Sequence, residues 1–400
     1  MGQGFGLGNA LGDGLGDGSL ESPKQEPLRS VHTTSFPKLL NEIGASVLVS
    51  TYQAGKLIIC RSEGETLNTH FRNFNRPMGL AANKQRLIIG AATQVHEFRN
   101  FPEVGKSVDE TGRTDACYMP RTSCVTGDID IHEMALGTEG LWLVNTRFSC
   151  LCVLDGWNSF VPRWRPPFLS GLSNEDRCHL NGLALVDGKP KYVTALGETD
   201  TRGGWRANKK SGGILMEVPS GEILLRGLSM PHSPRWYNGK LWVLESGEGR
   251  LSIVKPDFSG TETVAEVPGF TRGLDFVGPF AFVGLSQVRE TAVFSGIPIT
   301  ERLTERICGV WVIDTRNGKE VAFVRFEDAV QEIFAVQVLV GTRFPDVIND
   351  DWKLIGRSYM LPNEALKDVA PPTPPEEGAD PEKEDKSVKP DALLPESPSE

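Results

Sequence analysis

The chain has 400 residues and a formal net charge of −10, of which residues 371–400 carry −6 through nine acidic residues and three lysines. The rest of the chain is close to neutral, which argues against broad nucleic-acid binding because such binding requires a basic surface. Hydrophobic residues make up 39% of the sequence, enough for a sizeable core, and 43 glycines are typical of many short strands and tight turns.

Both ends of the chain differ from its centre. Residues 1–35 are rich in Gly, Asp, Ser and Pro, and residues 369–400 in Pro, Glu and Lys, so we expect both segments to be disordered. The N-terminus lacks the pattern of a signal peptide, and no stretch has eighteen unbroken apolar residues. The seven cysteines show no CxxC spacing, which favours reduced thiols. We therefore expect a soluble, cytoplasmic protein with no membrane partner and a folded body over residues 36–361.

Short strands separated by turn residues follow one another through this body. The first three predicted strands are residues 46–52, 56–60 and 67–74. From residue 78 onward the pattern repeats in units that contain an apolar strand, a second strand about ten residues later and, in most units, a third and a fourth strand. There is no helical period, so each unit is expected to be a four-stranded antiparallel meander, the blade of a β-propeller.

The first strands of these units align on one polar-to-apolar junction. In its clearest copy, residues 175–185, His179 and Asn181 precede an apolar run. Equivalent positions recur 40 to 60 residues apart, at Met78, His132, Asn181, His232, Arg272 and Glu332. A period near fifty residues indicates one repeat domain, where length alone would suggest two or three domains.

The ring is expected to close through both ends of the body. The last predicted inner strand, residues 332–339, has no complete unit after it, whereas the first three strands lack an inner partner. Joining them removes the exposed sheet edges that a gap would leave. The predicted fold is therefore all-β, a single six-bladed β-propeller whose closing blade is shared by N-terminal and C-terminal strands. The blade around residues 95–127 is the least regular.

Inner strands of a propeller surround a central channel, so their starts should converge at one mouth of it. Three of the six histidines, His132, His179 and His232, lie at these starts. Neutral imidazoles suit a divalent transition metal such as Zn, Fe, Mn or Cu, and suit calcium poorly. The alternative is a structural polar channel in which these histidines bond water and backbone.

The metal hypothesis predicts a metal-dependent enzyme, a hydrolase, lyase or oxidase. Glu332 would be a fourth ligand or a general base, Asn181 would orient bound water or substrate, and Arg272 would neutralise negative charge. The substrate would be a small anionic metabolite or a peptide side chain. The competing function is a non-catalytic platform for a protein or ligand, which needs an exposed apolar patch and tolerates loss of the histidines.

Residues beside the junctions offer further groups. Glu175 and Asp176 either orient His179 or pair with Arg177 in a solvated loop. Loops that carry Arg and Trp, at residues 163–168 and 202–210, either clamp an anionic ligand through guanidinium groups or pack their Trp between blades. Both alternatives stay open at the level of sequence.

Four segments carry a resemblance to a known family: residues 161–168, 175–184, 227–235 and 282–286. They resemble those of a family of bacterial conserved hypothetical proteins, a domain of unknown function, over residues 35 to about 345. This resemblance implies a propeller-like fold and no activity. More loosely, the architecture is similar to six-bladed lactonase-type propellers, the gluconolactonase and regucalcin group, whose metal sits on Glu, Asn and Asp. Because this chain offers histidines there, neither calcium nor lactone hydrolysis is carried over.

Overall fold

The computed structural model describes residues 28–109, 111–288 and 296–362, together with 364, 365, 367 and 369. The chain divides into two compact units, Met1–Ser358 and Tyr359–Glu400. In the second unit, Lys367 and Glu364 form an ion pair within a turn. Residues 1–27 of the predicted arm and residues 370–400 of the predicted tail lie outside the described residues.

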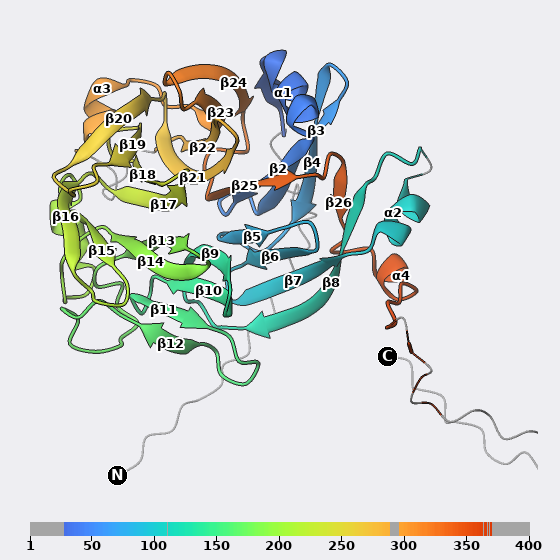
Figure 1. Ribbon diagram of the computed structural model, residues 1–400, viewed down its shortest axis with the longest axis horizontal. Helices are drawn as coiled ribbons and strands as arrows, with labels where there is room; N and C mark the ends of the chain where they lie inside the picture. The colour runs from blue at the N-terminus through green and yellow to red at the C-terminus, as the bar shows by residue number, and fades with distance from the viewer. Residues whose placement is uncertain are drawn as a thin grey trace, which may run out of the picture. The chain divides into compact units, whose positions relative to one another are not determined.

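The described part of the first unit contains six sheets arranged around one centre as the blades of a propeller (Figure 1). Each inner strand packs between the inner strands of two neighbouring blades, so the ring is closed. This confirms the predicted six-bladed β-propeller. The inner strands are β5 (Leu80–Ala82), β9 (Ile131–Gly137), β13 (Leu180–Val186), β17 (Pro231–Tyr237), β21 (Phe270–Val277) and β25 (Ala335–Val340).

Three more strands follow outward from each inner strand. The blade of β25 continues with β2 (Ala45–Thr51), β3 (Lys56–Glu63) and β4 (Thr66–Asn73). The blade of β5 continues with β6 (Arg86–Gly90), β7 (Gln94–Asn100) and β8 (Ala116–Val125). The blade of β9 continues with β10 (Gly140–Asn145), β11 (Cys150–Val153) and β12 (Val161–Trp164). The blade of β13 continues with β14 (Lys189–Ala195), β15 (Gly213–Glu217) and β16 (Ile223–Leu228). The blade of β17 continues with β18 (Lys240–Glu245), β19 (Arg250–Val254) and β20 (Thr261–Glu266). The blade of β21 continues with β22 (Phe280–Ser286), β23 (Cys308–Asp314) and β24 (Lys319–Phe326).

Position within a blade explains the sequence of each strand. The middle strands β2 and β23 are buried at every residue, because neighbouring blades cover both of their faces, and they read as nearly continuous apolar runs. The outer strand β24 alternates between buried and more exposed residues towards its end. The described helices are short: α1 (Ser35–Ile43), α2 (Pro102–Val108), the 3₁₀-helix η1 (Gly204–Asn208), α3 (Pro298–Arg302) and α4 (Trp352–Ile355). The irregular blade is the one in which α2 separates β7 from β8.

The closing blade joins the two ends of the propeller as predicted. In β25, Val338 lies opposite Val47 of β2, in an antiparallel pair, and Figure 1 shows these strands, orange-red and blue, side by side. The strand begins at residue 335, three residues later than expected. The reason is that Ile333 bonds through both its N–H and its carbonyl to the hydroxyl of Ser286 in the preceding blade.

Both ends of the propeller chain also add a fifth strand to a blade. β1 (Ser30–His32) pairs antiparallel with β24, and β26 (Pro345–Val347) pairs parallel with β8. These additions cover two sheet edges. The prediction that the disordered arm reaches residue 35 is therefore wrong for its last residues. A polar segment becomes ordered there because an open strand edge supplies backbone hydrogen bonds, which composition does not reveal.

A hydroxyl near the end of the second strand ties most described blades to the next one. The hydroxyls of Ser50, Thr146, Ser246 and Ser286 donate to the carbonyls of Met78, Leu180, Thr271 and Ile333, respectively, where the next inner strand starts. Thr194 acts through Asn181, which donates to the carbonyl of Pro231. All five hydroxyls belong to buried residues. Each bond therefore satisfies a carbonyl whose loss of a partner would cost about 1–3 kcal/mol.

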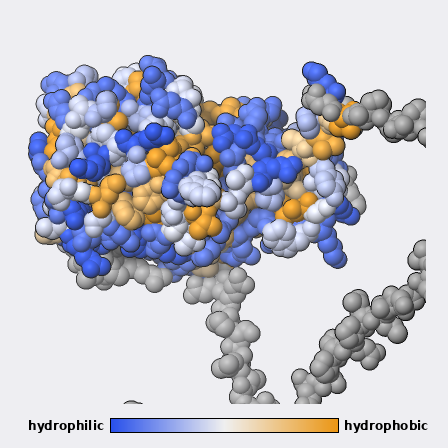
Figure 2. All heavy atoms as spheres, turned by 90° about the horizontal axis from the view of Figure 1, so that it is seen from below, coloured by the Kyte–Doolittle hydropathy of each residue, from blue (hydrophilic) through white to orange (hydrophobic). Residues whose placement is uncertain are grey.

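One side of the molecule, seen in Figure 2, carries hydrophobic residues in patches among hydrophilic ones. Within the described ranges, no helix has the length and apolar character needed to cross a membrane. All seven cysteines belong to the described residues and are free thiols.

An ion pair bridges two blades inside the ring. Arg235 of β17 donates two hydrogen bonds, 2.9 and 3.0 Å long, to the two carboxylate oxygens of Glu133 in β9. The blade of β13 lies between these two blades in the chain, so the pair crosses the channel. The Glu133 side chain is 5% exposed and that of Arg235 is 24% exposed. The pair therefore links non-adjacent blades in a largely desolvated position.

We predict that Glu133→Ala lowers the free energy of unfolding by about 3–5 kcal/mol, because it leaves the Arg235 charge desolvated and unpaired. The double variant Glu133→Leu/Arg235→Met should recover most of this loss, since it removes both charges. Urea unfolding measures the effect. Glu103→Ala is the matched control, because the exposed pair of Glu103 with Lys106 should contribute less than about 1 kcal/mol. Similar small losses for both single variants would contradict the prediction.

Candidate ligand site at the channel mouth

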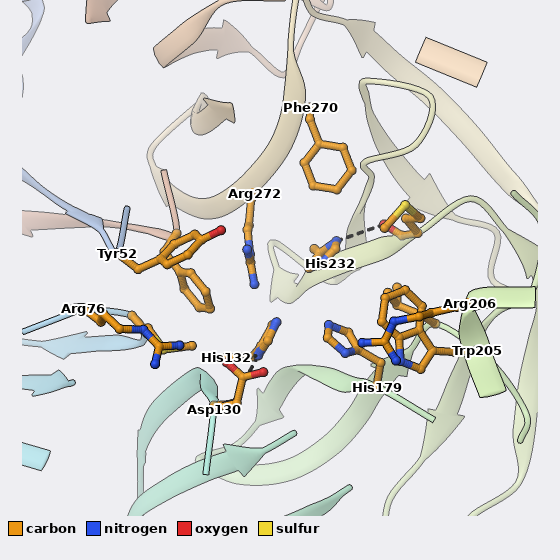
Figure 3. A pocket seen from close by; sticks show the side chains of 14 residues that line it. Tyr52, Arg76, Asp130, His132, His179, Trp205, Arg206, His232, Phe270 and Arg272 are labelled. Atoms are coloured by element: carbon orange, nitrogen blue, oxygen red, sulfur yellow. Dashed lines mark hydrogen bonds and ion pairs between the residues drawn. The ribbon is translucent and has the colours of Figure 1, made fainter. Parts of the chain in front are cut away.

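A cavity of about 190 Å³ lies where the inner strands begin. Its lining combines three imidazoles, three guanidinium groups, four aromatic rings and the carboxyl group of Asp130. Figure 3 shows His132, His179, His232 and Arg272 pointing toward a common space, with Tyr52 and Arg76 on one side and Trp205 and Arg206 on the other. The structure thus brings together residues from all six blades.

The hydrogen bonds of His132 determine which ring nitrogen carries its proton. Nδ1 lies 2.8 Å from Oγ1 of Thr146 and 3.2 Å from the carbonyl oxygen of Asp130. The single hydroxyl proton of Thr146 is donated to the carbonyl of Leu180. Thr146 must therefore accept a hydrogen bond from Nδ1–H. Nε2 of neutral His132 is then unprotonated and acts as an acceptor.

His232 repeats this arrangement two blades further along the chain. Its Nδ1 lies 2.9 Å from Oγ of Ser246 and 3.0 Å from the carbonyl oxygen of Met230. Ser246 donates its proton to the carbonyl of Thr271, so it too accepts from Nδ1–H. The spacing between histidine and hydroxyl is 14 residues in both blades. Nε2 of neutral His232 is again an acceptor.

His179 is oriented by a carboxylate instead. Its Nδ1 lies 2.9 Å from Oδ1 of Asp176, while Oδ2 of Asp176 accepts a hydrogen bond of 2.9 Å from the indole N–H of Trp205. The Trp205 ring also packs against the His179 imidazole, with 4.5 Å between ring centroids. Glu175, by contrast, pairs with Arg177. Of the two roles considered for these carboxylates, Asp176 therefore orients His179, and Glu175 pairs with Arg177.

Two of the imidazoles are held in the neutral form. Burial lowers the pKa of His132 and His232 well below 6.5, and the nearby Arg272 guanidinium lowers both further. The ring centroids of these histidines are 6.4 Å apart, and those of His132 and His179 are 4.7 Å apart. Burial also raises the pKa of the Asp130 carboxyl group, although His179 and Arg272 oppose this shift.

Arg272 presents a positive charge to the cavity and forms no direct ion pair with a described residue. Its Cζ lies 3.6 Å from the centroid of the Phe334 ring, and no described residue forms an ion pair or a hydrogen bond with its guanidinium group. Burial lowers its pKa, while the charges of Tyr52, Asp130, Glu332 and Glu133 act to raise it, and arginine stays protonated near neutral pH. The other two arginines have acidic neighbours, because Arg76 lies 3.9 Å from Asp128 and Arg206 lies 3.4 Å from Asp176.

Backbone strain is concentrated around this cavity. Four lining residues other than glycine have left-handed backbone conformations: Arg76, Asp130, His179 and Met230, with φ of 51°, 54°, 53° and 47°. Such conformations cost on the order of 1 kcal/mol or more each and persist only where surrounding contacts impose them. Their clustering here is typical of a functional site.

Residues 34–348 match the model of a protein family described as Domain of unknown function (DUF4915). The chain belongs to this family. The match covers the region in which the sequence resembles a family of unknown function. No curated protein matches the chain at a significant level.

Two solved structures show weak similarity to this DUF4915 chain. One is titled "Crystal structure of Nidogen/Laminin Complex", with 12% identity, a TM-score of 0.46 and coverage of 75% of this chain and 100% of that chain. The other is a protein of unknown function from Bacteroides caccae, with 11% identity, a TM-score of 0.46 and coverage of 74% and 99%.

Two residues predicted for the site lie outside the cavity lining. Asn181 accepts from the Thr194 hydroxyl and donates to the carbonyl of Pro231, so its side chain joins two blades. Glu332 lies beside Tyr52, where burial and a hydrogen bond to Glu332 raise the pKa of the tyrosine to about 12. Both positions align with the histidines in sequence, but their side chains are engaged within the protein.

Several lining residues were not identified as site residues from the sequence. Tyr52 ends a predicted strand, Asp130 stands two residues before His132, and Phe334 stands two residues after Glu332. Their short distance from the junctions was the available signal. Of the two loops that carry Arg and Trp, only residues 202–210 contribute described residues to the lining, through Trp205 and Arg206.

The fit of the site to a metal ion can be judged from the histidines themselves. Among the described residues, no three His, Cys, Asp or Glu side chains are grouped so that they could hold a metal. In addition, the Arg272 charge that lowers the pKa of His132 and His232 also opposes a dication beside them. As placed, the side chains do not form a ready metal site.

We predict that acidification destabilises the protein through His132 and His232. Their folded-state pKa lies below the unfolded value of 6.5, so below pH 6.5 the unfolded chain binds protons that the folded protein excludes. The contribution of each imidazole to the free energy of unfolding should be at its maximum above pH 6.5. It should fall by up to about 1.4 kcal/mol per pH unit as the pH drops toward the folded-state pKa. Urea unfolding between pH 7.5 and 5 measures this slope. The variant His132→Phe/His232→Phe should be less pH-dependent, and parallel curves would contradict the assignment.

Proposed function

We propose that the cavity at the channel mouth binds a small anionic molecule and that the protein acts on it. The observation that carries the proposal is the Arg272 guanidinium group, which faces the cavity without a direct ion pair or hydrogen bond to any described residue. Desolvating a charge is costly unless the charge is paired. A carboxylate or phosphate group would supply the missing partner and bind a guanidinium through charge-assisted hydrogen bonds.

The groups around Arg272 support chemistry on the bound molecule. His132 and His232 are neutral, with Nε2 able to accept a proton, while burial raises the pKa of Asp130 and so favours its protonated form. Carboxyl and imidazole groups shifted in this way can act as acid and base in one site. Proton transfer by these groups would serve hydrolysis of an anionic substrate or elimination from it.

We predict that Arg272→Gln weakens the binding of small carboxylates and phosphates at least tenfold, because the cavity loses its unpaired cation. Calorimetric titration of a panel of both anion classes measures this affinity. Arg86→Gln is the matched control, because Arg86 pairs with Glu97 and lies outside the cavity lining.

Equal anion binding by wild type and Arg272→Gln would contradict the proposed function. If, in addition, one protein partner remained bound after loss of Arg272 and of the three histidines, a non-catalytic binding platform would be the better hypothesis.

A metal-dependent enzyme is the second candidate. It would require the three imidazoles to move together around an ion, because they are not grouped to hold one as placed, but one observation favours it. Each of His132, His179 and His232 has Nδ1 bonded to a hydroxyl, a backbone carbonyl or a carboxylate. This is how proteins hold metal-binding imidazoles, with Nε2 left for the ion. A bound divalent transition metal would supply a Lewis acid or an activated water.

For this second candidate, we expect protein purified without a His tag to contain near-stoichiometric Zn, Fe, Mn or Cu. The variant His132→Ala/His179→Ala/His232→Ala should lose the metal while its circular dichroism spectrum stays unchanged. Elemental analysis measures the metal content of the wild type and of the variant. A wild type that stays metal-free after dialysis against each ion would remove this candidate and leave the anion site unaffected.

A further inference from the structure

The cavity places the Arg272 guanidinium group, which has no direct ion pair, beside hydrogen-bond acceptors, and this combination restricts the ligand. Because Nδ1 donates within the protein, Nε2 is the free nitrogen of neutral His132 and of neutral His232. Within the described ranges, no side chain or backbone N–H donates to either Nε2. The two imidazoles therefore offer hydrogen-bond acceptors to a ligand, whereas the neighbouring Arg272 guanidinium group can only donate hydrogen bonds.

We infer that the anion bound here carries hydroxyl groups next to its charged end, so that it is a small hydroxylated carboxylate or phosphate. This inference rests on the proposed function and narrows the class of its ligand. The charged end would pair with Arg272, and the hydroxyl groups would donate to Nε2 of His132 and His232.

The need for donors follows from desolvation. A ligand that fills the cavity displaces water from both Nε2 atoms, and a buried acceptor left without a partner costs about 1–3 kcal/mol. Sites that hydrogen-bond a ligand hydroxyl therefore discriminate strongly against the analogue that lacks it. An anion without donors would satisfy Arg272 and leave both imidazoles unpaired.

The choice of hydroxyl over ammonium follows from the charge of Arg272. Its guanidinium group and the His132 imidazole both pack against the Phe334 ring, with the Arg272 Cζ 3.6 Å and the imidazole centroid 5.0 Å from the ring centroid, and His232 lines the same cavity, so both imidazoles lie in its positive potential. An ammonium group at Nε2 would meet the same repulsion. A neutral hydroxyl donates an equivalent hydrogen bond without this penalty.

The aromatic walls are compatible with such a ligand. Phe270 and Phe334 pack against His232 and His132, with ring centroids 5.7 and 5.0 Å apart. These rings offer surface to the carbon skeleton of the ligand and help to exclude water, which strengthens the polar contacts at Arg272 and at the imidazoles.

The test compares anions that differ only in hydroxyl groups: malate with succinate, glycerate with propionate, and glycerol 3-phosphate with propyl phosphate. Calorimetric titration of the full-length protein should show at least tenfold tighter binding of the hydroxylated member in one pair or more. The pair that responds distinguishes a carboxylate ligand from a phosphate ligand.

Variants of His132 and His232 test whether the preference for the hydroxylated anion comes from their imidazoles. His132→Phe and His232→Phe keep a planar ring but remove the acceptor, so each should reduce the preference at least threefold while the affinity for the deoxy member stays within twofold. His96→Phe is the control, because His96 bonds Ser123 outside the cavity lining and its loss should leave the preference intact. Independently of any variant, the ¹⁵N resonances of His132 and His232 in the wild type should report protonation at Nδ1 and shift at Nε2 when the hydroxylated member is added.

The outcomes separate this inference from the function on which it rests. Equal binding of both members of every pair, a preference that survives both His→Phe variants, or protonation at Nε2 would overturn the inference alone. A transition metal bound to the three histidines would also overturn it, because the Nε2 lone pairs would be occupied. Failure of every anion to bind, or unchanged binding by Arg272→Gln, would overturn the proposed anion site itself.

Discussion

The structure depends on a hydrogen bond between a hydroxyl near the end of one blade's second strand and a carbonyl at the start of the next inner strand. Ser50, Thr146, Ser246 and Ser286 make this bond directly, and Thr194 makes it through Asn181. Each bond satisfies a buried backbone carbonyl where an inner strand begins at the channel. The blades are thus aligned at their inner ends by polar contacts, while apolar packing holds their faces together.

At two of these joints the same hydroxyl also determines the protonation of a histidine. Thr146 and Ser246 have one proton each and donate it to the next blade, so they accept from Nδ1 of His132 and His232. The contact that orders the ring therefore also makes Nε2 an acceptor in the cavity. Assembly of the fold and chemistry of the site rest on one set of hydrogen bonds.

The cavity collects features that lower stability. An unpaired guanidinium group, two imidazoles held neutral by burial and several left-handed backbone conformations all lie around it. Proteins keep such destabilising features mainly at functional sites, where the surrounding well-packed residues hold the strained groups in position. Here the surround includes the ion pair of Glu133 and Arg235, which crosses the channel between non-adjacent blades.

The sequence by itself determined the six-bladed ring, its closure by a C-terminal strand, and the convergence of three histidines with Arg272, because strand alternation and a repeat near fifty residues are properties of the chain. Only the tertiary structure decided which aligned side chains face the cavity. Asn181 and Glu332 occupy equivalent positions, yet both are engaged within the protein. Among their partners, Pro231 lies 50 residues from Asn181, and Tyr52 and Glu332 come from opposite ends of the propeller chain, as do β1 and β24. Hydrogen-bond partners across blades leave no local pattern, so the tautomers of His132 and His232 and the unpaired state of Arg272 became visible only in three dimensions.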